Sequence, residues 1–134
     1  MLGRVSEDNV AVLKRGFANF GDTGSPDPST LDPELEIINF ESFPVTRPYH
    51  GMEGLIQWLA DISEPFDGFK FELVEVLAHD DEHVVTAVRA SGTSRTGGPP
   101  FELEWGAIYS FRSGRLFRAE GFRTPAEALL SSGL

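Results

Sequence analysis

Apolar residues near the amino terminus recur at the spacing of a helix. One side of this segment is lined by Val10, Leu13, Phe17 and Phe20. Intervals of three or four residues place such side chains on one face of an α-helix. Ser6 precedes the stretch, and the acidic residues after it suit the positive end of a helix dipole. The pattern predicts a helix that is capped by Ser6 and turns one face to a core.

The next segment, residues 21–33, has the composition of a loop. Its prolines and glycines predict no regular element beyond a short helical turn near residues 29–32. Residues 35–43, LEIINFESF, are instead typical of a strand. Residues 44–51 show no regular pattern.

A second amphipathic helix is predicted to begin at Gly51 and to end before Pro65, because proline cannot continue a helix. Trp58 lies near the edge of its apolar face. That face is formed by Met52, Leu55, Leu59 and Ile62.

Beyond this helix the pattern is that of strands almost to the end of the chain. The predicted strands cover residues 69–78, 84–93, 101–111 and 116–122. Their connections, HDDEH, SRTGGPP and RSGR, are short and polar. Short connections of this kind join consecutive antiparallel strands, whereas parallel strands need long crossovers.

The last strand runs into a helix signal. Thr124 is a capping residue, Pro125 takes the first helical position and Glu127 the third, so residues 126–130 should begin a short closing helix. Two helices, four strands in a meander and a terminal helix indicate an α+β domain with its helices on one face of a twisted sheet.

Composition narrows the class of protein. A chain of 134 residues fits one domain, spanning 1–134, with a core of its own. The formal net charge of −10 would repel phosphate backbones, and the basic residues are scattered, so nucleic acid is a poor partner. No apolar run approaches the roughly 20 residues of a membrane span. With neither an apolar leader nor a cysteine, the cytoplasm is the expected location.

Three segments carry a resemblance to a known family. They are YHGMEGLIQWL, HDDEHVVTAVRASGTSRTGG and GAIYSFRSGRLFRAEGFRTPAEALLSSGL. Together with the order of elements, they are similar to the SnoaL-like families of the nuclear transport factor 2-like superfamily, which includes ketosteroid isomerases, limonene epoxide hydrolase and polyketide cyclases. The resemblance implies a cone-shaped antiparallel sheet packed against three helices, an internal cavity and a homodimer formed through the outer face of the sheet. It implies no particular reaction.

Aromatic residues are the candidate walls of that cavity. Alternation along the predicted strand 101–111 puts Trp105 and Tyr109 on one side, which should face the helices. Each combines apolar area with one hydrogen-bonding group, which suits a pocket that orients a small apolar ligand. Trp58 of the second helix is a further candidate wall. The alternative for Trp105 and Tyr109 is that they are ordinary core residues.

Charged residues supply the candidates for proton transfer. Glu41, on the predicted strand 35–43, lies near the place of the catalytic base in ketosteroid isomerase, whose tyrosine has no counterpart in the first helix here. Arg89, Arg118 and Glu120 partly resemble the Asp-Arg-Asp set of limonene epoxide hydrolase, with Glu120 as a candidate catalytic residue and Arg89 and Arg118 as candidate ligand-binding residues. If Glu120 faces the cavity, burial would raise its pKa and a neighbouring arginine would lower it. Solvated ion pairs are the alternative.

His50 precedes the second helix, near the implied mouth of the cavity, where a histidine could shuttle a proton. Local hydrogen bonding is the alternative there. His79 and His83 flank an acidic turn, but their spacing matches no metal template, so a solvated turn is expected and no metal. The sequence also contains no phosphate-binding loop, no nucleophile-elbow serine and no cysteine nucleophile, so no cofactor is expected.

These residues are compatible with two main functions and with a third that has less support. The first is cofactor-free isomerisation, cyclisation or hydration of a small, mostly apolar molecule, with Glu41 or Glu120 moving the proton. The second is a module that binds a small-molecule ligand, or a protein partner, without chemistry. The third is an accessory protein that dimerises through its sheet. A buried carboxylate facing an open cavity would favour the enzyme, because burial tunes such a group for proton transfer.

Overall fold

Three α-helices, one short 3-10 helix and six strands are formed by the residues that the structure describes. The structure is a computed structural model that describes residues 2–45 and 49–134, with the main chain alone for residues 2–7. The elements are α1 (Leu2–Thr23), η1 (Pro28–Thr30), β1 (Leu31–Ile38), β2 (Tyr49–His50), α2 (Gly51–Ser63), β3 (Phe66–His79), β4 (His83–Ser94), β5 (Pro100–Arg112), β6 (Arg115–Phe122) and α3 (Pro125–Ser132).

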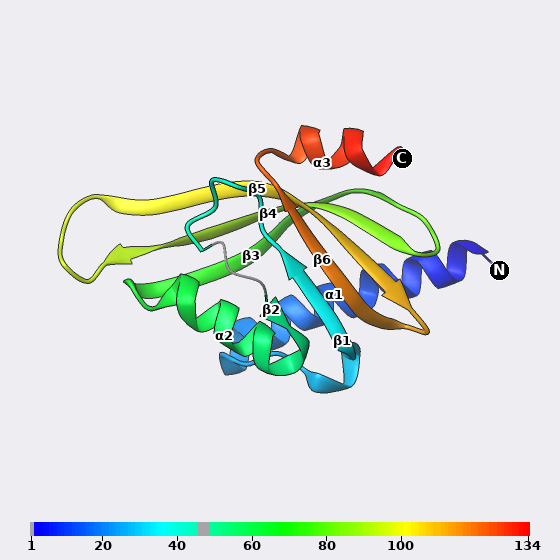
Figure 1. The fold of residues 1–134 in the computed structure, drawn as a ribbon, viewed down its shortest axis with the longest axis horizontal. Coiled ribbons are helices and arrows are strands. Elements are labelled where there is room, and N and C mark those ends of the chain that lie inside the picture. The colour runs from blue at the N-terminus through cyan, green and yellow to red at the C-terminus, as the bar shows by residue number, and fades with distance from the viewer. Residues whose placement is uncertain (1, 46–48) are drawn as a thin grey trace.

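The strands form one sheet in the order β2-β1-β6-β5-β4-β3. β3 to β6 are an antiparallel meander, as their short polar connections predict. β1 adds to this meander in parallel with β6, and β2 pairs antiparallel with β1. The predicted α+β class, with a curved and mostly antiparallel sheet packed against three helices, is therefore confirmed (Figure 1).

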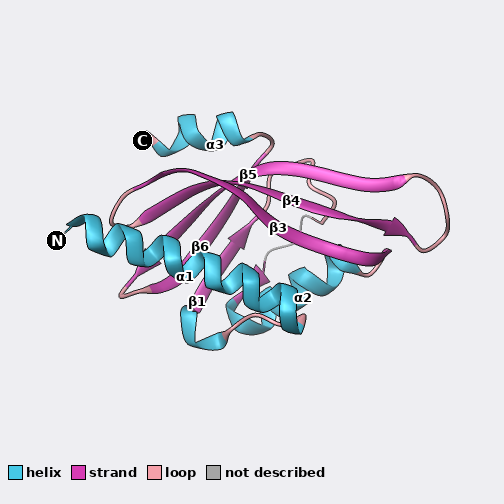
Figure 2. Ribbon diagram, turned by 180° about the vertical axis from the view of Figure 1, so that it is seen from behind, coloured by secondary structure: helices cyan, strands magenta, loops and turns pink. Residues whose placement is uncertain are grey.

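The helices lie on both faces of the sheet. Figures 1 and 2 show α1 and α2 on one face, here called the inner face, and α3 on the opposite, outer face. Ala128 of α3 is fully buried against Val85 and Ile108, which form a small second core on the outer face. The prediction that all helices share one face is thus wrong for α3. These apolar outward residues need a cover, and α3 provides it.

The main core lies between the inner face and the first two helices. It is rich in aromatic rings that contact one another edge to face or stacked. Its aromatic members include Phe17, Phe43, Trp58, Phe71, Trp105 and Tyr109.

The ends of the helices match the prediction at α2 and α3 and not at α1. The Thr124 hydroxyl accepts a hydrogen bond from the Glu127 backbone N–H at 3.1 Å, so Thr124 is the cap of α3. The first helix begins at Leu2, so Ser6 lies inside α1 and does not cap it. No helix within the described residues is long and apolar enough to cross a membrane.

β1 is displaced from the predicted strand, residues 35–43. It begins at Leu31 and includes Pro33, a residue that breaks the ladder of a central strand. The pairing of β1 with β6 is irregular between Leu31 and Glu36, so the missing N–H of Pro33 falls where the ladder is interrupted. The strand also ends at Ile38, which leaves Glu41 in a turn.

Candidate functional site

A cavity of about 120 Å³ lies between the inner face of the sheet and helices α1 and α2. Its walls come from α1, the loop before β1, and parts of β1, α2, β3, β5 and β6. Most of the lining residues are apolar. Apart from the two indole rings, the lining residues with polar side chains are Asp27, Thr30, Asn39, Tyr109 and Glu120.

Aromatic rings build one wall of this cavity. The Trp105 ring stacks on Phe71, with centroids 5.6 Å apart and planes within 9° of parallel. Phe71 in turn meets Trp58 nearly edge to face at 5.4 Å. Trp58 is only 6% exposed, so it lies in the core and not at the edge of its helix face. The structure thus brings Trp58, Trp105 and Tyr109 to the same cavity.

Tyr109 supplies a neutral hydroxyl to the cavity wall. Burial raises the pKa of Tyr109 well above its usual value of 10.0, because the phenolate form would lose its hydration. The hydroxyl therefore stays protonated at neutral pH and is available as a hydrogen-bond donor. In the described part of the chain, no hydrogen bond of this hydroxyl is found.

Asn39 is the first residue after β1 and is one of the residues that line the cavity. The Asn39 Oδ1 accepts a hydrogen bond from the Trp58 Nε1–H at 3.0 Å. The Asn39 Nδ2 is buried and has no hydrogen-bond partner among the described residues. Asn39 was not among the site residues predicted from the sequence. The one signal was a single amide inside the otherwise apolar run IINF.

Gly16 lines the cavity from the side of α1. It lies within the helix, where glycine is less favourable than alanine. A Cβ atom added at Gly16 would meet no atom within 4 Å, so the missing side chain leaves open space at the cavity wall.

Asp27 is the carboxylate at the margin of the cavity. Its Oδ1 accepts hydrogen bonds from the Ser29 hydroxyl at 2.8 Å and from the Ser29 backbone N–H at 3.0 Å. These bonds lower the pKa of Asp27 below its usual value. The group is ionised near neutral pH, and its hydrogen bonds hold it at the N-cap of η1.

Glu41 and His50, two of the predicted catalytic residues, lie away from the cavity walls. Glu41 is exposed in the turn after β1, so its predicted position on a strand is wrong. His50 is exposed at the start of α2, where its side chain makes no capping hydrogen bond. It lies opposite Glu36 in a separate polar depression that also includes Arg112.

Glu120 and Arg118 belong to the outer face. Strand pairing joins Tyr109 to Ala119 on the inner face and Ile108 to Glu120 on the outer face. Glu120 borders the cavity, but its carboxylate lies 3.7 Å from the Arg118 guanidinium and 35% of the side chain is exposed. The condition that Glu120 faces the cavity is therefore not met, and the alternative of a solvated ion pair describes it.

Arg89 has a similar surface environment. Its guanidinium lies 3.7 Å from the carboxylate of Glu72, and both side chains are more than one third exposed. In the sheet, Arg89 of β4 pairs with Glu104 of the neighbouring strand β5. The structure does not bring Arg89 to the cavity, so its predicted contact with a ligand has no support there.

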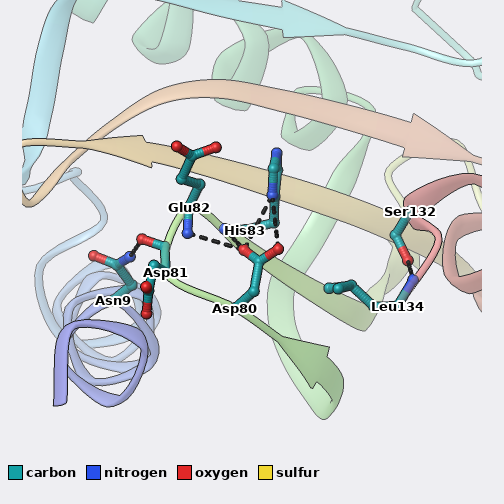
Figure 3. Close-up of polar contacts among 7 residues, drawn as sticks. All are labelled: Asn9, Asp80, Asp81, Glu82, His83, Ser132 and Leu134. Carbon is teal, nitrogen blue, oxygen red and sulfur yellow. Dashed lines mark hydrogen bonds and ion pairs between the residues drawn. The ribbon is translucent and has the colours of Figure 1, made fainter. Parts of the chain in front are cut away.

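The acidic turn between β3 and β4 is closed by hydrogen bonds. Asp80 Oδ1 accepts from the backbone N–H groups of Glu82 at 2.9 Å and His83 at 2.7 Å, and lies 3.1 Å from His83 Nδ1 (Figure 3). Burial raises the pKa of Asp80, but these hydrogen bonds together outweigh it and lower the pKa below its usual value. The Asn9 amide fixes the turn to α1 by donating to the Asp81 carbonyl at 2.9 Å. No group of potential metal ligands is found among the described residues.

The fold and the site together define a class of protein, that of cone-shaped α+β domains with a cavity between the sheet and the helices on its inner face. Residues 29–119 match the family model of the SnoaL-like domain. The chain belongs to this SnoaL-like family. The cone-shaped fold that the resemblance implied is confirmed.

Solved structures of the same fold are distant in sequence. Bal32a, from a soil-derived mobile gene cassette, is 20% identical with a TM-score of 0.74, over 88% of this chain and 90% of its own. TerC, co-crystallised with polyporic acid, is 20% identical with a TM-score of 0.70, over 90% and 94%. A ketosteroid isomerase-like protein from Catenulispora acidiphila, in complex with trimethylamine, is 13% identical with a TM-score of 0.60, over 80% and 79%. The comparison with curated proteins gives no match.

Proposed function

We propose that this domain binds a small, mostly apolar organic molecule in the cavity beneath the inner face of its sheet. The observation that carries the proposal is an aromatic-lined cavity of about 120 Å³ within the main core. Protein interiors are close-packed, and voids larger than a water molecule are few. An apolar cavity of about 150 Å³ stays dry and binds benzene, so a molecule of that order of size is the expected ligand.

The relatives of known structure support binding as a function of the fold. TerC was crystallised with polyporic acid and the Catenulispora acidiphila protein with trimethylamine. These two molecules differ greatly in size and charge, so the fold alone does not choose the ligand. In this chain, the residues of the cavity wall determine which ligand binds.

Binding is better supported than acid/base catalysis. An enzyme of the predicted kind needs a carboxylate buried against the cavity. Among the described residues, Glu41 is exposed in a turn and Glu120 pairs with Arg118 on the outer face. Asp27 lies at the margin, but its lowered pKa makes it a weak proton acceptor near neutral pH.

A cofactor-free isomerase, cyclase or hydrolase is the second candidate, and the Tyr109 hydroxyl is the observation in its favour. A protonated donor in a water-poor cavity would stabilise an oxyanion on a ligand. Turnover that is lost in Asp27→Asn or in Tyr109→Phe, with the fold intact, would establish this candidate.

Intrinsic fluorescence gives a direct test of binding. The chain has two tryptophans, Trp58 and Trp105, and both line the cavity. Titration with benzene, toluene and other molecules of similar size should change the emission saturably. Gly16→Leu places a side chain in the open space and should abolish the change, whereas Gly21→Leu, also in α1 and with open space around its Cβ, should keep it. The proposal fails if none of these molecules causes a saturable change.

A homodimer through the outer face of the sheet stays a prediction. Ile108, an apolar residue of the outer face, is 8% exposed because α3 covers it. Val74 is 41% exposed and remains available on the uncovered part of the sheet. Sedimentation equilibrium at micromolar concentration should give the mass of a dimer, and a monomeric mass would contradict the prediction.

A further inference from the structure

We propose that the ligand of this cavity carries an acceptor oxygen, such as a ketone carbonyl, that takes the hydrogen bond of the Asn39 Nδ2–H. The inference rests on the proposed binding function and names the class of ligand for the same site. It follows from the orientation of the Asn39 amide and from the lack of a partner for its nitrogen among the described residues.

The contact with Trp58 fixes which end of the Asn39 amide faces the indole. An indole N–H is a donor only, so it requires an acceptor. The 3.0 Å bond from Trp58 Nε1 therefore goes to Oδ1, and the reversed amide would set two donors against each other. Because α2 holds Trp58 in the buried core at 6% exposure, this orientation is held by the fold and not by solvent.

The Asn39 nitrogen is left as a donor without an acceptor. It is buried, and no protein atom among the described residues accepts from it. A buried polar group that lacks a partner costs free energy, and unsatisfied groups of this kind are uncommon in native proteins. Asn39 belongs to the cavity wall, so a ligand in the cavity is the natural source of the missing acceptor.

The surrounding groups favour a neutral oxygen over a charged ligand. The wall is mostly apolar, and an ion placed there would lose its hydration without an opposite charge. The Tyr109 hydroxyl is a second donor in the wall, which again suits an acceptor. The net charge of −10 disfavours an anion as well. A small ketone with an apolar ring meets all of these conditions.

Two ligands of the same shape test the inference in the native protein. Cyclohexanone and methylenecyclohexane differ in having C=O or C=CH₂, so the pair isolates the acceptor. Calorimetric titration should give the ketone about five- to tenfold higher affinity, which is the usual worth of one added hydrogen bond. In nitrogen-resolved NMR spectra, the side-chain amide of Asn39 should shift with cyclohexanone and hardly move with methylenecyclohexane.

A variant then assigns the preference to Asn39. Asn39→Leu removes the donor and should bind the two molecules about equally. The NMR measurement on the native protein decides the matter if this variant does not fold.

The outcomes separate this inference from the proposed function. Equal affinities of the native protein for the two molecules, with no shift of the Asn39 amide, would overturn the inference and leave the binding function standing. An unchanged ketone preference in a folded Asn39→Leu variant would also overturn it. If neither molecule binds and the panel of apolar molecules also fails, the proposed function falls, and the inference falls with it.

Discussion

The two faces of the sheet differ in how tightly β5 is packed against its neighbours. On the outer face, α3 lies so close to β5 that a Cβ atom at Gly106 would come within 2.5 Å of the Thr124 carbonyl oxygen and 2.7 Å of the Ala128 Cβ. On the inner face, the neighbouring residue Ala107 borders a cavity, and Gly16 across from it leaves space for a side chain. Adjacent residues of one strand thus meet a filled contact and a hollow.

This difference in packing between the two faces supports the proposal that a ligand binds at the inner face. A filled contact maximises buried area and dispersion, as a stable fold requires. A cavity reduces both buried area and dispersion, since the atoms that line it lose contacts. The chain covers part of the outer face with a short helix and leaves a cavity in the larger, aromatic core of the inner face. In line with the proposed function, the contact between α3 and β5 stabilises the fold, and the cavity of the inner face is the proposed ligand site.

The largest expected effect comes from breaking the outer contact. Gly106→Ala forces a Cβ atom against the backbone of Thr124 and Pro125, which has little freedom to move. Overpacking of this kind should lower the free energy of unfolding by about 3 kcal/mol. Urea denaturation measures it. An unchanged midpoint would show that α3 packs loosely and that the two faces do not differ.

The buried Tyr109 should make the inner face sensitive to high pH. Its pKa is raised in the folded state, so its contribution to stability is complete below the unfolded value of 10.0 and is lost as the pH rises above it. The slope should approach about 1.4 kcal/mol per pH unit for this one group. Denaturation curves between pH 8 and 11 measure the loss. Tyr109→Phe is the control, and the same slope in that variant would contradict the account.

Filling the hollow from α1 should separate stability from binding. Gly16→Ala and Gly21→Ala both replace a helical glycine in open space, so each should stabilise the fold by about 0.5 to 1 kcal/mol. Only Gly16 borders the cavity, so only Gly16→Ala should weaken the binding of small apolar molecules. Equal binding by the two variants would mean that the ligand does not reach α1.

The smallest effects are expected from the carboxylates. Glu120→Gln removes a half-exposed ion pair with Arg118, and Glu41→Gln changes an exposed turn. Both should change the free energy of unfolding by less than about 1 kcal/mol and leave ligand affinity unchanged. A tenfold loss of affinity in either variant would return that carboxylate to the site and blur the division between the faces.

The meander and its inner residues were predictable because they depend on local signals. Short polar turns predict antiparallel neighbours, and period-two alternation along residues 101–111 places Trp105 and Tyr109 on the inner face. The cap of α3 follows from Thr124 and the proline after it. These features need no knowledge of the rest of the fold.

The remaining features depend on long-range pairing. Pro33 is a strand-breaking residue by its sequence, but the irregular pairing of β1 with β6 accommodates it. β1 therefore begins at Leu31 and ends at Ile38, so that Asn39 and Glu41 lie beyond the strand. The face of Glu120 is set by its pairing with Ile108. No local pattern shows that Trp58, nineteen residues beyond Asn39, orients its amide.

The central claim is that the hollow of the inner face is a ligand site, and NMR of the two indole N–H groups tests it most directly. Trp58 and Trp105 both line the cavity, and the Trp58 Nε1–H bonds Asn39 inside it. Titration with cyclohexanone should shift both resonances saturably in the native protein and in Gly21→Leu, and should leave them unmoved in Gly16→Leu. Indole resonances that stay unmoved in the native protein, or that shift equally in Gly16→Leu, would contradict the account.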